Sequence, residues 1–142
     1  MDSPEVLGSH AFVTALAVRG PLTEQVCADT LCDIARSIGM KSDGLHKATW
    51  RYPAFGAGGE GLTMVQPIVE SFLAWDTWSE HGGGYLFVVS CRLYQASKIR
   101  LVLEAHGLEV IDEQRITLAI DGHLERHPPA AFTDDVRGRA YP

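Results

Sequence analysis

Several features that mark common protein classes are missing from this sequence of 142 residues. No apolar run approaches the roughly 20 residues that a membrane-spanning helix needs. The N-terminal residues MDSPEVLGSH lack the basic start and the apolar stretch of a secretory signal. A net charge of -6 argues against a nucleic-acid-binding surface, where basic residues are expected in excess. We therefore expect a cytoplasmic protein that has no membrane span and no nucleic-acid partner.

The cysteines exclude two further classes. The sequence has three of them, Cys27, Cys32 and Cys91, which is an odd number without the spacing of zinc ligands. Neither a disulfide framework nor a metal site is expected. Hydrophobic residues make up 46% of the chain and charged residues 21%, which at this length is typical of one folded globular domain.

Local patterns predict both strands and helices. Apolar, partly β-branched residues predict a strand over 10–18 that ends at Gly20-Pro21. Apolar residues three or four positions apart predict an amphipathic helix over 23–40, capped by Thr23 and ended near Gly39. Further patterns predict strands at 46–52, 62–69 and 85–91, a helix at 97–105, and one or two closing strands within 108–120.

The order of these elements predicts an α+β fold, a two-layer α/β sandwich in which two helices lie on one face of a largely antiparallel sheet. Pro67 favours an edge position or a bulge for its strand, because proline has no backbone N–H. The glycine-rich segment 53–61 lacks the Lys-Ser/Thr ending of a phosphate-binding loop. We place the domain at residues 1–120 and expect the polar residues 121–142 to form an extended C-terminal tail.

The segment from Gly61 to Cys91 holds the motifs with chemical meaning. It contains, in this order, Gly61-Leu62-Thr63, Glu70-Ser71-Phe72, Asp76-Thr77-Trp78-Ser79-Glu80, and an apolar run ending in Cys91. This segment resembles the core of the short bacterial S-adenosylmethionine decarboxylases. In that family Gly-Val-Ser, Glu-Ser-His, His-Thr-Trp-Pro-Glu and a strand ending in Cys follow one another at the same spacing. A weaker resemblance covers Gly8 to about Leu118 and includes Gly8-x-His10.

The resemblance implies that the chain cuts itself between Glu70 and Ser71. In the family the serine hydroxyl attacks the carbonyl of the preceding glutamate, the peptide becomes an ester, and elimination leaves a pyruvoyl group on the new N-terminus. That cofactor, here derived from Ser71, accepts the electrons released when an amino-acid substrate loses carbon dioxide. The implied activity is decarboxylation of S-adenosylmethionine or a related amino acid, a step of polyamine biosynthesis.

The resemblance also implies roles for other residues. Cys91 donates a proton to the decarboxylated carbon, the hydroxyl of Thr63 assists processing, and Glu80 binds ribose hydroxyls. Asp76 stands where the family has a histidine that assists cleavage. An adenosyl sulfonium ligand suits aromatic rings, for which the candidates are Trp50, Tyr52, Phe55 and Trp78. The family pairs its protomers around the active site, so a homodimer or larger homo-oligomer is expected.

Two family histidines are absent, because Phe72 and Asp76 occupy their positions. An imidazole exchanges protons near neutral pH, whereas an unperturbed aspartate remains ionised. Three hypotheses therefore stand. The chain is a self-processed decarboxylase, an uncleaved relative that uses the same pocket for another reaction in specialised metabolism, or a non-catalytic small-molecule-binding or regulatory homologue.

The same residues also have ordinary structural explanations. A serine such as Ser71 is commonly a turn residue, and Cys91 at the end of an apolar run is commonly a small buried hydrophobe. Thr63 suits any strand, Glu80 suits a solvated turn, and the aromatic residues suit a core. Only their joint spacing supports the functional interpretation.

Overall fold

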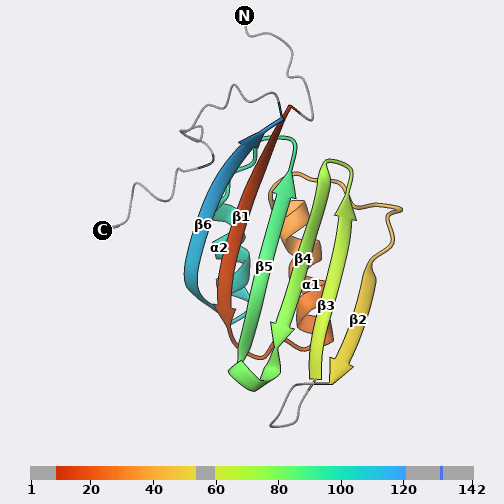
Figure 1. The fold of residues 1–142 in the computed structure, drawn as a ribbon, viewed down its shortest axis with the longest axis vertical. Coiled ribbons are helices and arrows are strands. Elements are labelled where there is room, and N and C mark those ends of the chain that lie inside the picture. Colours follow the sequence, from red (N-terminus) through yellow and green to blue (C-terminus); the bar gives the residue numbers. More distant parts are fainter. Residues whose placement is uncertain (1–8, 54–59, 121–131, 133–142) are drawn as a thin grey trace, which may run out of the picture.

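The computed structural model describes residues 9–53, 60–120 and 132 (Figure 1). The elements in chain order are β1 (His10–Arg19), α1 (Glu24–Ser37), β2 (Ala48–Pro53), β3 (Glu60–Ile68), β4 (Ser71–Trp78), the 3-10 turn η1 (Ser79–His81), β5 (Gly83–Ser90), α2 (Ser97–Ala105) and β6 (Glu109–Ala119). The strands form one sheet in the order β2-β3-β4-β5-β1-β6, with every neighbouring pair antiparallel. Both helices lie behind this sheet in Figure 1, on one face. The predicted two-layer α+β sandwich is confirmed.

Helix α1 forms as its sequence predicts. The backbone N–H of Val26 donates to the Thr23 hydroxyl at 3.2 Å, which caps the first turn. Gly39 follows the helix with a φ of 76°, a left-handed conformation that favours glycine. The buried stripe of Cys27, Leu31 and Ile34 packs on the sheet. Because burial raises the pKa of the Cys27 thiol to about 12, this cysteine is an apolar core residue.

Strand β4 is not predicted from the sequence, whose patterns indicate a connection over residues 70–84 between the strands at 62–69 and 85–91. The structure shows an interior strand between β3 and β5. Its inward residues include the fully buried Leu73 and Trp75, but its outward residues Phe72, Ala74 and Trp78 are apolar as well. A strand with apolar side chains on both faces has no polar–apolar alternation, so its sequence does not display the period of two.

Trp75 joins the two layers at the centre of the fold. Its indole Nε1 donates to the Thr30 hydroxyl of α1 at 2.9 Å, and the Thr30 hydroxyl itself donates to the Val26 carbonyl at 2.8 Å. Both side chains are inaccessible to solvent. A buried indole N–H needs an acceptor, so this bond sets the position of α1 over β4.

Pro67 lies in a part of β3 that is paired on one side only, although β3 is an interior strand of the sheet. Strand β2 pairs with β3 only as far as Val65, which lies opposite Ala48. At Pro67 the strand has one paired neighbour, Phe72 of β4. The edge position that the proline predicts is correct locally, although the strand as a whole is not at the edge.

Buried charges fix β6 beneath α2. Glu113 accepts hydrogen bonds from Arg100 at 3.0 Å and from Arg115 Nε at 2.7 Å, and its side chain is only 2% exposed. A buried carboxylate is tolerated because two guanidinium groups bond to it. Arg115 Nη1 also donates to the backbone carbonyl of Phe132 at 2.7 Å.

The predicted tail contributes one residue to the core. Residues 121–142 lie outside the described part of the chain except for Phe132, which is fully buried. Its ring packs edge-on against Tyr94 and tilted against Phe12, with centroid distances of 5.3 and 5.8 Å. Nothing in the residue pattern of 121–142 predicts this contact. Within the described ranges, no helix is both long and apolar enough to cross a bilayer.

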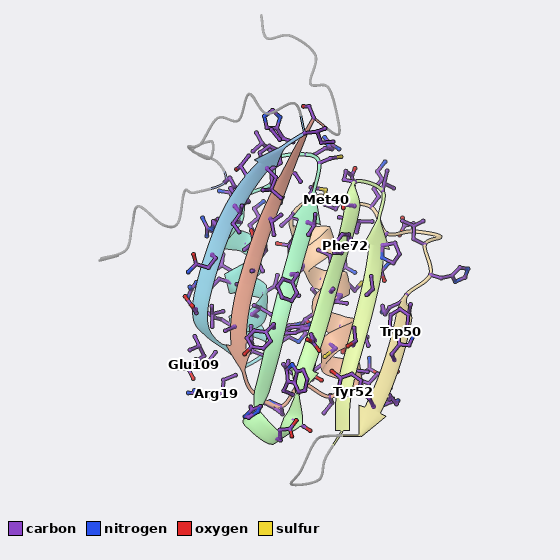
Figure 2. The ribbon with its side chains drawn as sticks, viewed as in Figure 1. Arg19, Met40, Trp50, Tyr52, Phe72 and Glu109 are labelled. Atoms are coloured by element: carbon purple, nitrogen blue, oxygen red, sulfur yellow. The ribbon has the colours of Figure 1, made fainter. Side chains whose placement is uncertain are left out.

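The opposite face of the sheet, here called the open face, has no covering layer among the described residues. Along β5 the residues Leu86 and Val88 point to the helices and are fully buried, whereas Tyr85 and Phe87 point away and are 49% and 38% exposed. Figure 2 views the molecule from this side and labels Trp50 and Phe72. The exposed apolar residues on it include Trp50, Phe72, Tyr85, Phe87, Ile111, Ile116 and Leu118. An apolar surface of this extent is typical of an interaction face.

Removing the Thr30 hydroxyl tests the link between the layers. Thr30→Val keeps the shape but leaves the Trp75 indole N–H buried without an acceptor, so we expect a loss of about 1 to 3 kcal/mol in the free energy of unfolding. Urea denaturation measures the loss. Thr49→Val, at an exposed strand position, is the control and should change stability by less than about 0.5 kcal/mol. Equal stability of both variants would contradict a structural role for this bond.

Candidate functional site

The residues singled out by their spacing fall into two groups at opposite ends of β4. Ser71 begins the strand and Asp76 is five residues further along, so their backbones are about 16 Å apart in an extended strand. We call Glu70, Ser71 and Cys91 the cleavage group. The second group, called the aromatic group, consists of Tyr52, Thr63, Asp76, Trp78 and Glu80. Within one chain the two groups do not meet.

The cleavage group is built on a tight turn. Val69 and Glu70 connect β3 to β4, where Ile68 lies opposite Ser71. The Cys91 backbone N–H donates to the Glu70 carbonyl oxygen at 3.1 Å. The carbonyl of the Glu70–Ser71 peptide bond is therefore polarised by a hydrogen bond from the neighbouring strand end.

A cavity of about 300 Å³ adjoins this turn. Ser71 and Cys91 both line it, so the structure brings together the predicted pyruvoyl precursor and the predicted proton donor. His10 and Ser90 are its other polar residues, and the remaining lining is apolar: Ala11, Val89, Leu118, Ala119 and Ile120. The cavity has the small number of polar groups in an apolar wall that is typical of a ligand site.

Glu70 is held by Arg92, a residue that no sequence motif singles out. The Glu70 side chain is 7% exposed and its Oε2 atom accepts a hydrogen bond from Arg92 Nη1 at 3.3 Å. Its Oε1 atom is buried and has no hydrogen-bond partner among the described residues. A buried carboxylate with one unsatisfied oxygen is energetically costly, which is common where a structure serves a function.

The aromatic group centres on Asp76. The Tyr52 hydroxyl donates to Asp76 Oδ1 at 2.9 Å, and the Thr63 hydroxyl lies 3.4 Å from the same oxygen. Thr63 faces Asp76 directly across the β3–β4 ladder. Burial raises the pKa of Tyr52 above its usual value, and the charges of Asp76 and Glu80 raise it further.

The Tyr52 ring explains why a glycine begins the first motif. A Cβ atom on Gly61 would lie 1.9 Å from the Tyr52 ring, so any side chain there would displace the tyrosine. The same ring meets Trp78 edge-on at a centroid distance of 5.9 Å. Next to Trp78 is a hollow of about 160 Å³, lined also by Arg19, His81 and Tyr85.

The remaining candidates have separate positions. Trp50 lies opposite Thr63 in the β2–β3 ladder and is 56% exposed on the open face. Glu80 lies in η1, directly after β4, and is partly exposed. Phe55 lies outside the described residues. Tyr52, considered in the sequence only for its ring, takes part through its hydroxyl, a contact that depends on the pairing of β2, β3 and β4.

No protein-family model and no curated protein matches this chain. Among solved structures it is similar to the adenosylmethionine decarboxylase from Aquifex aeolicus VF5, with 16% sequence identity and a TM-score of 0.47. The similarity covers 84% of this chain and 95% of that one.

The hydrogen bond between Tyr52 and Asp76 predicts a titration shift. Asp76→Asn removes a negative charge that disfavours the phenolate, so the pKa of Tyr52 should fall toward the ordinary tyrosine value of about 10. NMR titration of tyrosine ring carbons measures it, with Tyr52→Phe identifying the signal. Asp112→Asn, at an exposed position of β6, is the control and should leave that pKa in place. A Tyr52 pKa that is the same in Asp76→Asn as in the wild type and in Asp112→Asn would contradict the contact.

Proposed function

We propose that the chain is a pyruvoyl-dependent decarboxylase that processes itself between Glu70 and Ser71 and acts on S-adenosylmethionine or a related adenosyl sulfonium amino acid. The observation that supports this most directly is the hydrogen bond from the Cys91 N–H to the Glu70 carbonyl oxygen, at 3.1 Å, beside a cavity that Ser71 and Cys91 share. The bond is aimed at the atom on which negative charge develops when a hydroxyl attacks that carbonyl.

The first step of processing is an acyl shift. Ser71 Oγ attacks the Glu70 carbonyl carbon, and the Cys91 N–H stabilises the oxygen that gains charge. The C–N bond then breaks, the Ser71 nitrogen takes a proton, and an ester joins Glu70 to the Ser71 oxygen. The tight turn suits this step. The bond that breaks connects β3 to β4, and the hydrogen bonds of the β3–β4 ladder keep the two strands paired after it is cut.

Elimination completes processing. Loss of the Ser71 α-proton expels the Glu70 carboxylate, and hydrolysis of the resulting enamine releases ammonia and leaves the pyruvoyl group. The residues present fit this group, because it forms from Ser71 itself at the wall of an existing cavity. The bound group supplies an electron sink for loss of carbon dioxide. Cys91 then holds the proton that the product carbon needs.

A homodimer would complete the site. The aromatic group lies at the far end of β4, and the open face between the two groups is apolar. In Figure 2, Phe72 lies toward the upper end of the sheet and Tyr52 toward the lower end. Two copies could pack with their open faces together, related by a two-fold axis that lies between the faces and runs at right angles to the strands. The end of one sheet that carries the cleavage group would then lie on the end of the other sheet that carries the aromatic group. Such an interface is closed and buries both apolar faces.

In this dimer each site would be shared. One chain would provide the cleavage group, and its partner would provide Trp78 and Glu80 for the nucleoside, with the Thr63 hydroxyl as the assisting group. A ring face suits adenine or the sulfonium, and a carboxylate suits two ribose hydroxyls. The 160 Å³ hollow beside Trp78 would then face the partner's cavity.

Self-processing predicts two fragments. Purified protein should separate under denaturing conditions into residues 1–70 and 71–142, and mass spectrometry should show that the second fragment begins with pyruvoyl. Ser71→Ala should give one full-length chain. Ser42→Ala is the matched control and should be cleaved as the wild type is. A wild-type chain that stays intact on long incubation would favour the uncleaved relative instead.

A shared site predicts complementation between two defective variants. Ser71→Ala cannot form the cofactor and should be inactive, and Glu80→Ala lacks the ribose contact and should be strongly impaired when the substrate is below its wild-type KM. In a mixed dimer one of the two sites is built entirely from wild-type residues. When equal amounts are refolded together, about half of the dimers are mixed, so about a quarter of the wild-type carbon dioxide release from carboxyl-labelled substrate should return. No recovery, despite folded proteins and cleavage of the Glu80→Ala chain, would show that each site is built within one chain.

A further inference from the structure

We infer that His10 is the proton-transfer group of the cavity that contains Ser71 and Cys91, serving both the hydroxyl and the thiol. This inference rests on the proposed self-processing at Ser71, and part of it can be tested in an uncleaved chain. A serine hydroxyl is a weak nucleophile that requires a neighbouring base, and a thiol that has given up its proton must regain one.

The carboxylate that the motif places in this role already has hydrogen-bond donors of its own. Asp76 of the same chain lies about 16 Å from Ser71 along β4. Its Oδ1 atom accepts hydrogen bonds from the hydroxyls of Tyr52 and Thr63, and in the shared site proposed above the partner's Asp76 would keep these bonds. Glu70 Oε2 is bonded to Arg92. Neither carboxylate lines the cavity, whereas His10 does.

The other histidines of the described residues lie elsewhere. His81 lines the hollow at the aromatic end of the sheet, and His106 Nε2 lies 2.8 Å from Asp33 between the two helices. His46 is exposed before β2. Among the described residues, His10 is thus the histidine that lines the same cavity as Ser71 and Cys91.

The pairing of β1 explains this placement. Ser90 of β5 is paired with Phe12 of β1 on one side and with Ser71 of β4 on the other. His10 is two residues beyond Phe12, at the strand end where Cys91 follows Ser90. The topology therefore brings the start of β1 and the ends of the β4–β5 pair to one cavity.

Local contacts orient the imidazole. Its Nδ1 atom is 3.0 Å from the Ser9 hydroxyl, and its ring stacks on Phe12 with an interplanar angle of 12°. The Nε2 atom has no hydrogen-bond partner among the described residues. When Nδ1–H donates to Ser9, Nε2 carries the lone pair that a base requires.

The proton balance is complete with this group. As Ser71 Oγ attacks the Glu70 carbonyl carbon, its proton passes to His10 Nε2. When the C–N bond breaks, the same proton passes to the Ser71 nitrogen, so the imidazole ends neutral. In turnover, Cys91 Sγ gives its proton to the product carbon. His10 Nε2 then takes from solvent the proton that decarboxylation consumes and passes it to the thiolate, so the thiol is restored and the imidazole ends neutral.

Processing kinetics with His10→Gln and His10→Ala test the role at Ser71. We expect fragments 1–70 and 71–142 to form about 10²- to 10⁴-fold more slowly in both variants, which is the usual contribution of a positioned acid–base group. Free imidazole should accelerate cleavage of His10→Ala, an effect that a purely structural residue would not show. His46→Gln is the matched control and should be cleaved at the wild-type rate.

Alkylation of Cys91 tests the role at the thiol without any cleavage. In the Ser71→Ala chain at pH 7, iodoacetamide should modify Cys91 severalfold more slowly after His10→Gln, because the thiolate is the reactive form. Cys32, which is exposed on α1, serves as the internal reference.

The outcomes separate the two proposals. Wild-type cleavage that is unaffected by His10→Gln but lost in Asp76→Asn would overturn the role of His10 while self-processing stands. An uncleaved wild type would overturn self-processing, and Cys91 alkylation would then decide the role of His10 alone. Slower alkylation after His10→Gln would support it, and an unchanged rate would overturn it.

Discussion

The register of β4 depends on Trp75, and both halves of the candidate site depend on that register. The indole is fully buried against α1 and donates its only hydrogen bond to Thr30. Side chains alternate along a strand, so fixing Trp75 inward directs Asp76 and Trp78 to the open face. A slip of one residue would bury the Asp76 carboxylate and expose the indole, which makes that alternative very unfavourable.

The two faces of the sheet consequently serve different purposes. The helix-covered face contains the core and the buried pairing of Glu113 with Arg100 and Arg115. The open face combines apolar side chains with the hydrogen-bonded carboxylate of Asp76. Stability comes from one face of each strand, so the other face is free to vary with function. Tyr52 and Gly61 illustrate this, because their contact positions a hydroxyl and contributes little to the core.

The sequence predicts more of the fold than of the site, for physical reasons. Helix α1 and strand β1 follow from local periodicity, a cap and a terminal glycine. Strand β4 does not, because its two faces are both apolar. The motif places Ser71 and Asp76 close in sequence, but an extended strand separates them, and nothing in linear spacing reveals this. The contacts of Tyr52 with Asp76, of Arg92 with Glu70 and of Phe132 with Tyr94 depend on strand pairing and packing between distant segments.

The sheet order has a consequence for a chain cut after Glu70. The first piece would hold β1, β2, β3 and α1, and the second would hold β4, β5, β6 and α2. In space these strands interleave, since β1 of the first piece lies between β5 and β6 of the second, and β3 pairs with β4. Separating the pieces would require breaking three ladders at once, so they would stay associated on dilution. The strand topology would make the two pieces one inseparable subunit, and the peptide bond at the turn would be dispensable once the sheet had formed.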